Sequence, residues 1–331
     1  PHLLREPRRQ RLQPRHVGRI PFRTLQKAAD LVEPGDVVAV MNGTYTEPRK
    51  GSNVLTIKRS GRPGAPITFT AYPGHRPVLN PRTAWNGISV YGASHIVIEN
   101  LEVKGNNAAL SLADAERSSS KTDPTYNTNC ISVEKNRESG TYPHHVDITG
   151  NLVHGCAGGG ISAIEADHVD IIGNHVHSNA WFTVYGTSGI SVLTPRDTGG
   201  GDPRTYKIRI TGNRVHDNET KVKWEGCHCY SDGNGIIVDT TKATPSAGGR
   251  PTTDAFWSPT TSATTTAVQV STPTRANTST SSTTRPTSTA AAPASPRPTP
   301  TSSPTTAPTY GSSTTSPTVA RARRPTARPA T

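Results

Sequence analysis

An internal repeat is the feature that most constrains how this chain can fold. Four segments share one pattern, which consists of an alternating apolar stretch, a turn and a second short apolar stretch. They are HIVIENLEVKGN from His95, HVDITGNLVHGC from His145, HVDIIGNHVHSN from His168 and YKIRITGNRVHDN from Tyr206. A third short stretch recurs beside them as GISV at Gly87, CISV at Cys130, GISA at Gly160, GISV at Gly189 and GIIV at Gly235. Repeats of this length predict a solenoid, in which each unit packs on the next.

The repeat favours short parallel strands over helices. Alternation of apolar and polar residues sends every second side chain of a strand to the same face. A leucine-rich horseshoe is the structural alternative, but it requires a leucine-rich consensus that this chain lacks. We therefore predict an all-β parallel β-helix whose coils include residues 85–239.

Equivalent residues of such coils form columns. Asn151, Asn174 and Asn213 fall in one column, and stacked amides there can hydrogen-bond to one another. A second column holds His154, His177 and His216. We interpret it as stacked rings at a turn, with a metal stripe as the alternative.

Composition divides the chain into three zones. Residues 1–20 are irregular and rich in arginine, residues 21–239 hold the predicted β-helix, and residues 240–331 form a Ser/Thr/Pro-rich tail expected to be disordered. Apolar residues from Phe22 to Val32 recur at helical spacing, and we predict a helix that caps the open end of the coil.

Both outer zones also permit a frameshift interpretation. Codons compatible with residues 2–17 give TYFVSPAGSDSNPGTS when they are read one base later, which resembles a strand followed by a polar turn. Residues 276–285 permit SKHVDVVNNT out of frame, close to HVDIIGN of the repeat. The hypothesis is that the two ends are the same coil read in the wrong frame, and the nucleotide sequence tests it.

The charge of the chain does not favour nucleic-acid binding. The net charge is +12, but residues 21–239 hold 21 Lys and Arg against 22 Asp and Glu. All the excess basicity therefore lies in the two end zones, and the body lacks the basic surface that phosphate binding needs. No run of apolar residues is long enough to span a membrane. No signal peptide is present, so we expect one to be missing from this chain.

Four cysteines are present, and their pairing is left open by the sequence. Cys130, Cys156, Cys227 and Cys229 make an even number, which permits disulfides in a secreted protein. The spacing Cys227-x-Cys229 is not that of a zinc site, so we interpret the four as buried or bridged thiols rather than metal ligands.

The chain resembles the pectate-lyase-like right-handed parallel β-helix proteins, and polysaccharide lyase family nine in particular. The segment PFRTLQKAADLVEPGDVVAVMNGTYTE (residues 21–47) resembles the opening of these proteins, and VDITGNLVHG and VDIIGNHVHSN are similar to their repeat. The resemblance implies a secreted protein that cleaves uronic-acid polymers by β-elimination, with Ca²⁺ held by aspartates and a Lys or Arg as the base. The aspartate cluster expected of that family is absent from the repeat region.

Candidate site residues follow from aligning the coils. The candidate ligands for calcium, which takes hard oxygen ligands, are Glu134, Glu165, Asp167, Asp232 and Asp239. Lys207 and Arg196 are the candidate catalytic residues, and Trp181 and Tyr185 are candidates for stacking on sugar rings. A solvated polar face and an insertion packed against the coil are the alternatives for the acidic and the aromatic residues.

Three functions fit these residues. The first is a secreted polysaccharide lyase acting on acidic polysaccharide with calcium, as a monomer without nucleic-acid or membrane partners. The second is a noncatalytic carbohydrate-binding or surface β-helix protein. The third is a glycoside hydrolase, which needs paired carboxylates such as Glu165 with Asp167 or Asp239.

Overall fold

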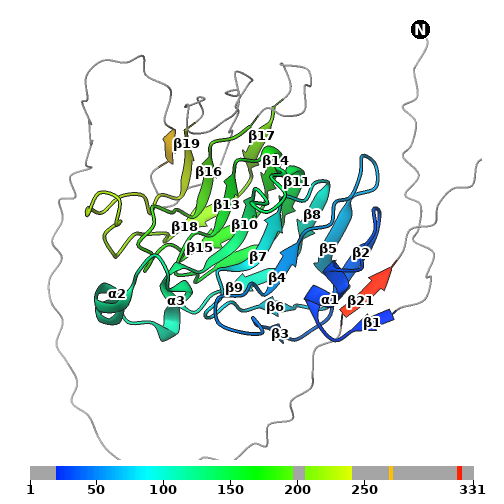
Figure 1. Ribbon diagram of the computed structural model, residues 1–331, viewed down its shortest axis with the longest axis horizontal. Helices are drawn as coiled ribbons and strands as arrows, with labels where there is room; N and C mark the ends of the chain where they lie inside the picture. The colour runs from blue at the N-terminus through cyan, green and yellow to red at the C-terminus, as the bar shows by residue number, and fades with distance from the viewer. Residues whose placement is uncertain (1–19, 197–205, 241–267, 271–318, 323–331) are drawn as a thin grey trace, which may run out of the picture. The chain divides into compact units, whose positions relative to one another are not determined.

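A computed structural model describes residues 20–196, 206–240, 268–270 and 319–322 (Figure 1). Its main body is a coil of three parallel sheets, in which the chain visits sheet A, sheet B and sheet C in turn. Six successive coils follow this order within the described residues, starting at Val37 and ending at Asp239. The predicted all-β parallel β-helix is confirmed, and its coils begin well before residue 85.

Sheet A is made of β1 (Ile20–Phe22), β21 (Val319–Ala322), β2 (Val37–Val40), β5 (Ile67–Ala71), β8 (Ile96–Glu99), β11 (His144–Thr149), β14 (Asp167–Ile172) and β17 (Ile208–Thr211). Sheet B is made of β3 (Thr44–Tyr45), β6 (Val78–Leu79), β9 (Glu102–Lys104), β12 (Leu152–His154), β15 (His175–His177) and β18 (Arg214–His216). Sheet C is made of β4 (Leu55–Ile57), β7 (Asn86–Tyr91), β10 (Asn129–Glu134), β13 (Ile161–Ile164), β16 (Ile190–Leu193), β19 (Ile236–Asp239) and β20 (Val268–Val270).

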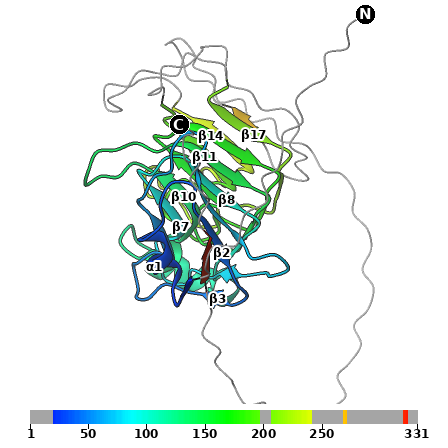
Figure 2. The same ribbon diagram turned by 90° about the vertical axis from the view of Figure 1, so that its right-hand side faces the viewer.

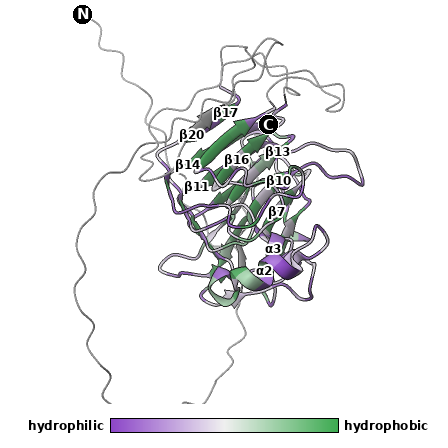
Figure 3. Ribbon diagram, turned by 90° about the vertical axis from the view of Figure 1, so that its left-hand side faces the viewer, coloured by the Kyte–Doolittle hydropathy of each residue, from purple (hydrophilic) through white to green (hydrophobic). Residues whose placement is uncertain are grey.

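The register stacks like residues on like residues. In sheet A, Val146 pairs with Ile96 on one side and with Val169 on the other. These side chains point into the coil and are buried, whereas the residues between them face outward. Figure 3 shows the strands coloured as hydrophobic and helix α3 (Pro124–Asn127) as hydrophilic. One continuous apolar core therefore runs through the coils and holds the sheets together.

An asparagine ladder lies at the turn between sheets A and B, as the repeat predicts. The Asn174 amide donates to the Oδ1 of Asn213 at 3.0 Å, and its Oδ1 accepts from the amide of Asn151 at 3.0 Å. Each amide also donates to a strand carbonyl one coil away, for example Asn174 to Ile148 at 2.8 Å. The ladder thus satisfies backbone groups that the turn buries.

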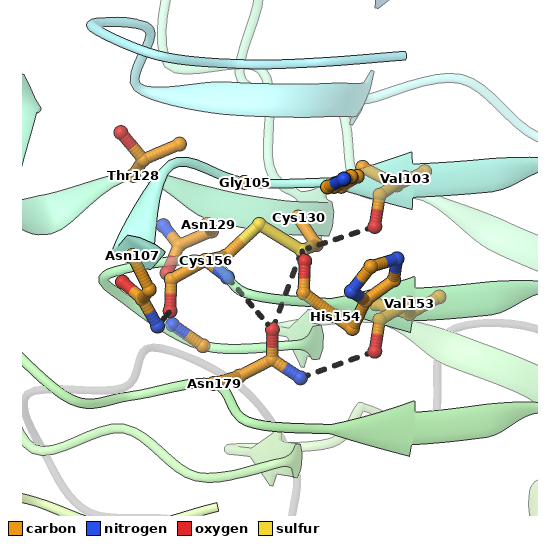
Figure 4. Close-up of a disulfide and its surroundings, with 12 residues drawn as sticks. Val103, Gly105, Asn107, Thr128, Asn129, Cys130, Val153, His154, Cys156 and Asn179 are labelled. Carbon is orange, nitrogen blue, oxygen red and sulfur yellow. Dashed lines mark hydrogen bonds between the residues drawn. A yellow bond between two sulfur atoms is a disulfide. The ribbon is translucent and has the colours of Figure 1, made fainter. Parts of the chain in front are cut away.

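Two disulfides resolve the pairing that the sequence leaves open. Cys130 at the start of strand β10 in sheet C is bonded to Cys156 in the turn after β12, and Cys227 is bonded to Cys229. Figure 4 shows the first bond inside the coil, beside the side chain of Asn179. That side chain accepts from the Cys156 N–H at 3.0 Å and donates to the Val153 carbonyl at 3.2 Å. The interpretation as bridged thiols holds for both pairs.

The first coil is covered by helix α1 (Leu25–Ala29). Thr24 caps its N-terminus by accepting from the Lys27 N–H, and its buried face of Leu25, Ala28 and Ala29 joins the core of the coil. Figure 2 shows α1 beside β2, at the start of the stack. The predicted capping helix is therefore present, although it is shorter than the apolar spacing indicates.

Two insertions project from the coil and pack against each other. The first lies between β9 and β10 and forms η1 (Asn107–Ala109), α2 (Leu112–Ser118) and α3. The second follows β15, and its Phe182 and Val184 share a small apolar cluster with Ala115 of α2. This contact places the second insertion next to sheet C.

Two short strands lie within residues 240–331, which the composition predicts to be disordered. Strand β20 continues sheet C beside β19, and β21 pairs antiparallel with β1 and β2 at the other end of sheet A. Both add to open sheet edges, which offer unpaired backbone groups. The rest of the tail and residues 1–19 lie outside the described residues, so the zone boundaries and the frameshift hypothesis stay predictions. No helix among the described residues has the length and apolar character needed to cross a bilayer.

Candidate functional site

A groove of about 730 Å³ runs over the outward face of sheet C, and we call it the sheet C groove. It crosses five strands, from β4 to β16, and the second insertion forms part of its wall. Its lining is mainly hydroxyl, amide and aromatic side chains with a few charges, including Asn53, Thr56, Lys58, Trp85, Asn86, Ser89, Tyr91, Asn129, Ser132, Glu134, Arg137, Ser162, Tyr185, Thr187 and Ser191.

A stripe of serines forms the floor of this groove. Ser89, Ser132, Ser162 and Ser191 are paired in register across β7, β10, β13 and β16. Neighbouring strands lie about 4.8 Å apart, so the hydroxyls repeat at that spacing along the coil. A line of regularly spaced hydroxyl groups can exchange hydrogen bonds with a polymer that is itself rich in hydroxyls.

Two hydroxyls at one end of the groove have no hydrogen-bond partner. They are the Oγ1 of Thr187 and the Oγ of Ser191, both buried, and neither contacts a protein acceptor or donor within the described residues. A buried polar atom without a partner is unfavourable by about 1–3 kcal/mol, so it usually marks the place of a water or a ligand. These two atoms therefore point to a ligand position at the β16 end.

Glu134 lies on the floor of the groove as its central acid. The Ser89 hydroxyl donates to its Oε1 at 3.2 Å. Burial raises the pKa of Glu134 above its usual value, while Ser89, the positive charge of Arg137 and Ser132 oppose that rise. Arg137 is held near it because its backbone N–H donates to the Tyr91 hydroxyl at 2.9 Å.

The two predicted stacking residues have different environments. Tyr185 lines the groove, is 38% exposed, and donates through its hydroxyl to the Lys121 carbonyl at 3.0 Å. Trp181 packs against the insertion cluster, donates to the Asp217 carbonyl, and has the Lys221 ammonium 3.7 Å from its ring centroid. The geometry thus brings Tyr185 to the groove, whereas Trp181 has the packing role that the sequence left as the alternative.

Asp232 lies beyond the β16 end of the groove, where it feels the negative charge of Asp239. Burial raises the pKa of Asp232, and the negative charge of Asp239 raises it further. The Asp232 carboxylate faces Gly186, where a Cβ would be only 2.4 Å from its Oδ2. The absence of a side chain at Gly186 therefore makes room for this carboxylate beside the groove.

The other predicted calcium ligands are separated from this pair. Glu134 and Asp239 share a column, but three strand spacings lie between them. Each spacing is about 4.8 Å, which is too far in total for the two carboxylates to share one ion. Glu165 lies at a left-handed turn with its Oε1 3.9 Å from Arg196. Asp167 is fully buried, with its Oδ1 2.8 Å from the Nδ1 of His168.

Calcium takes six to eight oxygen ligands, and none of the five predicted ligands belongs to a converging group of three or more such side chains among the described residues. They do not form a complete calcium site, so no reaction step is assigned to this ion. Of the two pairs predicted for a hydrolase, Glu165 with Asp167 has one buried member and one member next to an arginine, and Glu165 with Asp239 stays a prediction.

The two predicted catalytic residues lie outside the groove. Lys207 is 2% exposed and directly precedes β17 of sheet A. Arg196 stacks its guanidinium 3.7 Å from the ring centroid of Tyr142 and donates its backbone N–H to the Ala166 carbonyl. Lys58 and Arg137 are the described cations that line the groove, and the repeat alignment does not single them out.

The serine stripe is the part of the site that sequence reasoning missed although its signal was present. Each serine is the third residue of a GISV-type stretch, at an outward position of the strand. Trp85, Thr187 and Lys58 carry no such signal, since they lie in or next to connections that differ from coil to coil.

A coil of three parallel sheets with a polar groove along one of them defines a right-handed parallel β-helix protein. Residues 15–158 match the family model described as Pel9A-like, right handed beta helix region. A solved structure titled "Crystal structure of pectate lyase Pel9A" is similar at 15% identity over 64% of this chain and 61% of that chain, with a TM-score of 0.30. A comparison with curated proteins gives no match. Residues 15–158 are thus similar in sequence to the Pel9A-like β-helix region.

Proposed function

We propose that this protein binds an acidic polysaccharide along the sheet C groove. The observation that carries the proposal is the serine stripe ending at the two unpartnered hydroxyls of Thr187 and Ser191. An extended sugar polymer laid along the coil would present a hydroxyl-rich edge to this stripe. Trp85, Tyr91 and Tyr185 line the same groove, and aromatic side chains suit the apolar faces of sugar rings.

The acidity of the polymer is inferred from the cations in the groove. Lys58 forms an exposed ion pair with Glu138 at 3.3 Å, and its ammonium lies 5.4 Å from the ring centroid of Tyr91. An exposed pair of this kind contributes little stability, so a substrate carboxylate can replace Glu138 at small cost. Arg137 supplies a second cation at the same end of the groove, and a guanidinium binds carboxylates well.

Binding is tested with polygalacturonate and with a neutral polysaccharide by calorimetry on the full chain. We expect the acidic polymer to bind more tightly, and Ser191→Ala combined with Thr187→Val to weaken binding about tenfold, since two ligand hydrogen bonds are lost. Lys58→Glu should weaken binding of the acidic polymer alone. Lys27→Glu, on the exposed side of α1, is the control and should change the binding of neither polysaccharide. Equal binding by all variants would place the ligand elsewhere.

A second candidate function is cleavage of the bound polymer by β-elimination. The carboxylate of Asp232 beside the β16 end, which the charge of Asp239 influences, and the Pel9A-like match favour it. Elimination creates a conjugated double bond, so the assay is the growth of ultraviolet absorbance from acidic polysaccharides with and without calcium. A calcium-dependent increase that Asp232→Asn abolishes supports a lyase. Binding without any increase supports a noncatalytic carbohydrate-binding protein instead.

Secretion is part of this proposal, because a polysaccharide substrate lies outside the cell. Two disulfides fit an oxidising compartment, where such bonds persist. Fractionation of the source cells tests the point, with the protein expected in the medium or at the cell surface.

A further inference from the structure

A compact group of imidazoles lies on the outward face of sheet A, away from the residues that line the sheet C groove. His95, His144 and His145, which we call the histidine cluster, each offer one ring nitrogen, and the three nitrogens lie within 4.8 Å of one another. Among the described residues, no other group of three or more His, Cys, Asp or Glu converges in this way. Nothing in the sheet C groove uses these side chains.

The coil itself places the three rings. His95 and His145 occupy the same position of successive coils, directly before β8 and within β11, and both have a left-handed φ, 56° and 53°. Their rings stack with centroids 4.8 Å apart. His144 is set edge-on to both rings, with centroids 5.2 Å and 5.0 Å away.

Backbone hydrogen bonds fix this arrangement. The His95 N–H donates to the His144 carbonyl at 3.1 Å, and the His144 N–H donates to the Ser94 hydroxyl at 3.1 Å. On the far side, the ring of His168 stacks on His145 at 4.4 Å, and the Oδ1 of Asp167 lies 2.8 Å from the Nδ1 of that ring. The cluster is therefore built into two neighbouring coils and supported by a third.

The separations suit a tetrahedral metal ion. Zinc–nitrogen bonds of about 2.0–2.1 Å put two ligand nitrogens roughly 3.3 Å apart. The Nδ1 atoms of His144 and His145 are 2.9 Å apart, and one nitrogen from each of the three rings lies within 4.8 Å of the other two. Small rotations of the side chains would complete the geometry.

The chemistry of the donors selects the class of metal. Three imidazoles without a carboxylate favour zinc, copper or nickel over calcium and magnesium, which prefer oxygen. His145 is exposed and lines a groove, so a further ligand position would face solvent.

We propose that His95, His144 and His145 form a zinc-type metal site that links the β8 and β11 coils and leaves one coordination position open to solvent. The ion would bind one ring nitrogen from each histidine. Bridging two coils would also stabilise the middle of the stack, since an ion that binds the folded state shifts unfolding by mass action.

The chain offers a matched control. His154, His177 and His216 also stack on successive coils, with centroids 4.8 Å and 5.0 Å apart, but they do not bring three donor nitrogens together. His144→Gln removes a donor and leaves the stack of His95, His145 and His168 in place. His177→Gln removes the central ring of the control column.

The test is titration of the metal-free full chain with ZnCl₂ by calorimetry, with Co²⁺ absorption as the readout of tetrahedral coordination. We expect one zinc per chain, at least about tenfold weaker binding by His144→Gln, and unchanged binding by His177→Gln. His95→Gln should match His144→Gln, with melting temperatures used to check folding. Absence of zinc binding, equal binding by His144→Gln, or loss of binding in His177→Gln would each overturn the proposal.

Discussion

Asn174 shows how one side chain can satisfy two coils. Its Oδ1 accepts from both the backbone N–H and the amide of Asn151, and its own amide donates to the Ile148 carbonyl and to Asn213. Removal of this side chain leaves several buried groups without partners, which a water cannot reach because Asn174 is 1% exposed. The loss of unfolding free energy on substitution of Asn174 therefore comes mainly from the neighbouring groups that it leaves without partners.

We expect Asn174→Ala to lower the free energy of unfolding by about 3 kcal/mol or more, since each buried group left unpaired costs about 1–3 kcal/mol. Chemical denaturation followed by circular dichroism measures it. Asn106→Ala is the control, because that side chain is partly exposed and makes no capping hydrogen bond. A change away from buried contacts usually alters stability by less than about 0.5 kcal/mol. Equal losses in the two variants would contradict the ladder.

The lowered pKa of His177 leads to a prediction about stability in acid. Burial, first, and then the positive charges that His154, His175 and His216 would carry lower its pKa from 6.5 to about 4, with Asp217 opposing. Between these two pH values the unfolded chain binds a proton that the folded chain does not. The free energy of unfolding should therefore fall as the pH falls from about 6.5 to about 4.

His177→Gln removes this titration, so its unfolding free energy should change less over that pH range than that of the unaltered chain. Denaturation at several pH values between 4 and 7 measures the slope. His228→Asn, at an exposed residue outside the column, should keep the original slope. A steeper slope in His177→Gln would show that the ring is charged in the folded protein.

Columns of asparagine and histidine were predictable from the sequence because the repeat period alone fixes them. The environments of Asp167 and Lys207 were not predictable from the sequence, although both residues lie in the repeat. Each lies at a turn where a strand of sheet A begins, and there alternation no longer decides whether a side chain points inward. Both are buried, and both lie at sheet A, whereas the groove lies on sheet C.

At the scale of elements, the Cys130–Cys156 disulfide joins the start of a sheet C strand to a turn at the end of sheet B. Its two cysteines have a sequence separation of 26, whereas that of Cys227 and Cys229 is 2. The chain-entropy relation gives about 3.5 kcal/mol for the longer loop and about 1 kcal/mol for the shorter one. The two bonds should therefore contribute unequally.

We expect the pair Cys130→Ala and Cys156→Ala to lose about 3 kcal/mol of unfolding free energy, and Cys227→Ala with Cys229→Ala to lose about 1 kcal/mol. Urea denaturation of the two double variants, each with its own pair of thiols removed, makes the comparison direct. Equal losses would mean that the first bond does not constrain the unfolded chain more than the second.

The elements themselves were predictable where the repeat is regular. Residues 95–218 show the pattern four times, and the strands fall on it. The coils from β2 to β6 escaped the repeat because their turns contain Pro-Gly and longer connections instead of the Gly-Asn turn. Helices α2 and α3 escaped because a short insertion lacks the several turns over which helical spacing becomes visible.

For the whole molecule, the sheet C groove is a product of stacking. Its floor takes one serine from each of several coils, and its wall comes from an insertion between β15 and β16. No segment of the sequence contains this surface, so residues such as Trp85 and Thr187 become neighbours of the stripe only when the coils are stacked. The sequence could predict the polar face of each strand but not the groove.

The length of the groove leads to a prediction about its ligand. From β4 to β16 the lining crosses four strand spacings along the coil, and each spacing is about 4.8 Å. Each sugar unit added to an oligosaccharide should gain contacts until the oligomer spans the groove, and further units should gain little. Calorimetry with acidic oligosaccharides of increasing length is expected to give an affinity that rises and then levels off.

The double variant Ser191→Ala with Thr187→Val distinguishes a continuous groove from a single subsite. It removes hydroxyls at the β16 end only, so it should weaken long oligomers, which reach both ends, and leave short oligomers seated at the β4 end nearly unchanged. An affinity that is the same for a disaccharide and for a long oligomer would instead place all the binding energy in one subsite. In that case the serine stripe would serve the packing of the coils and not the ligand.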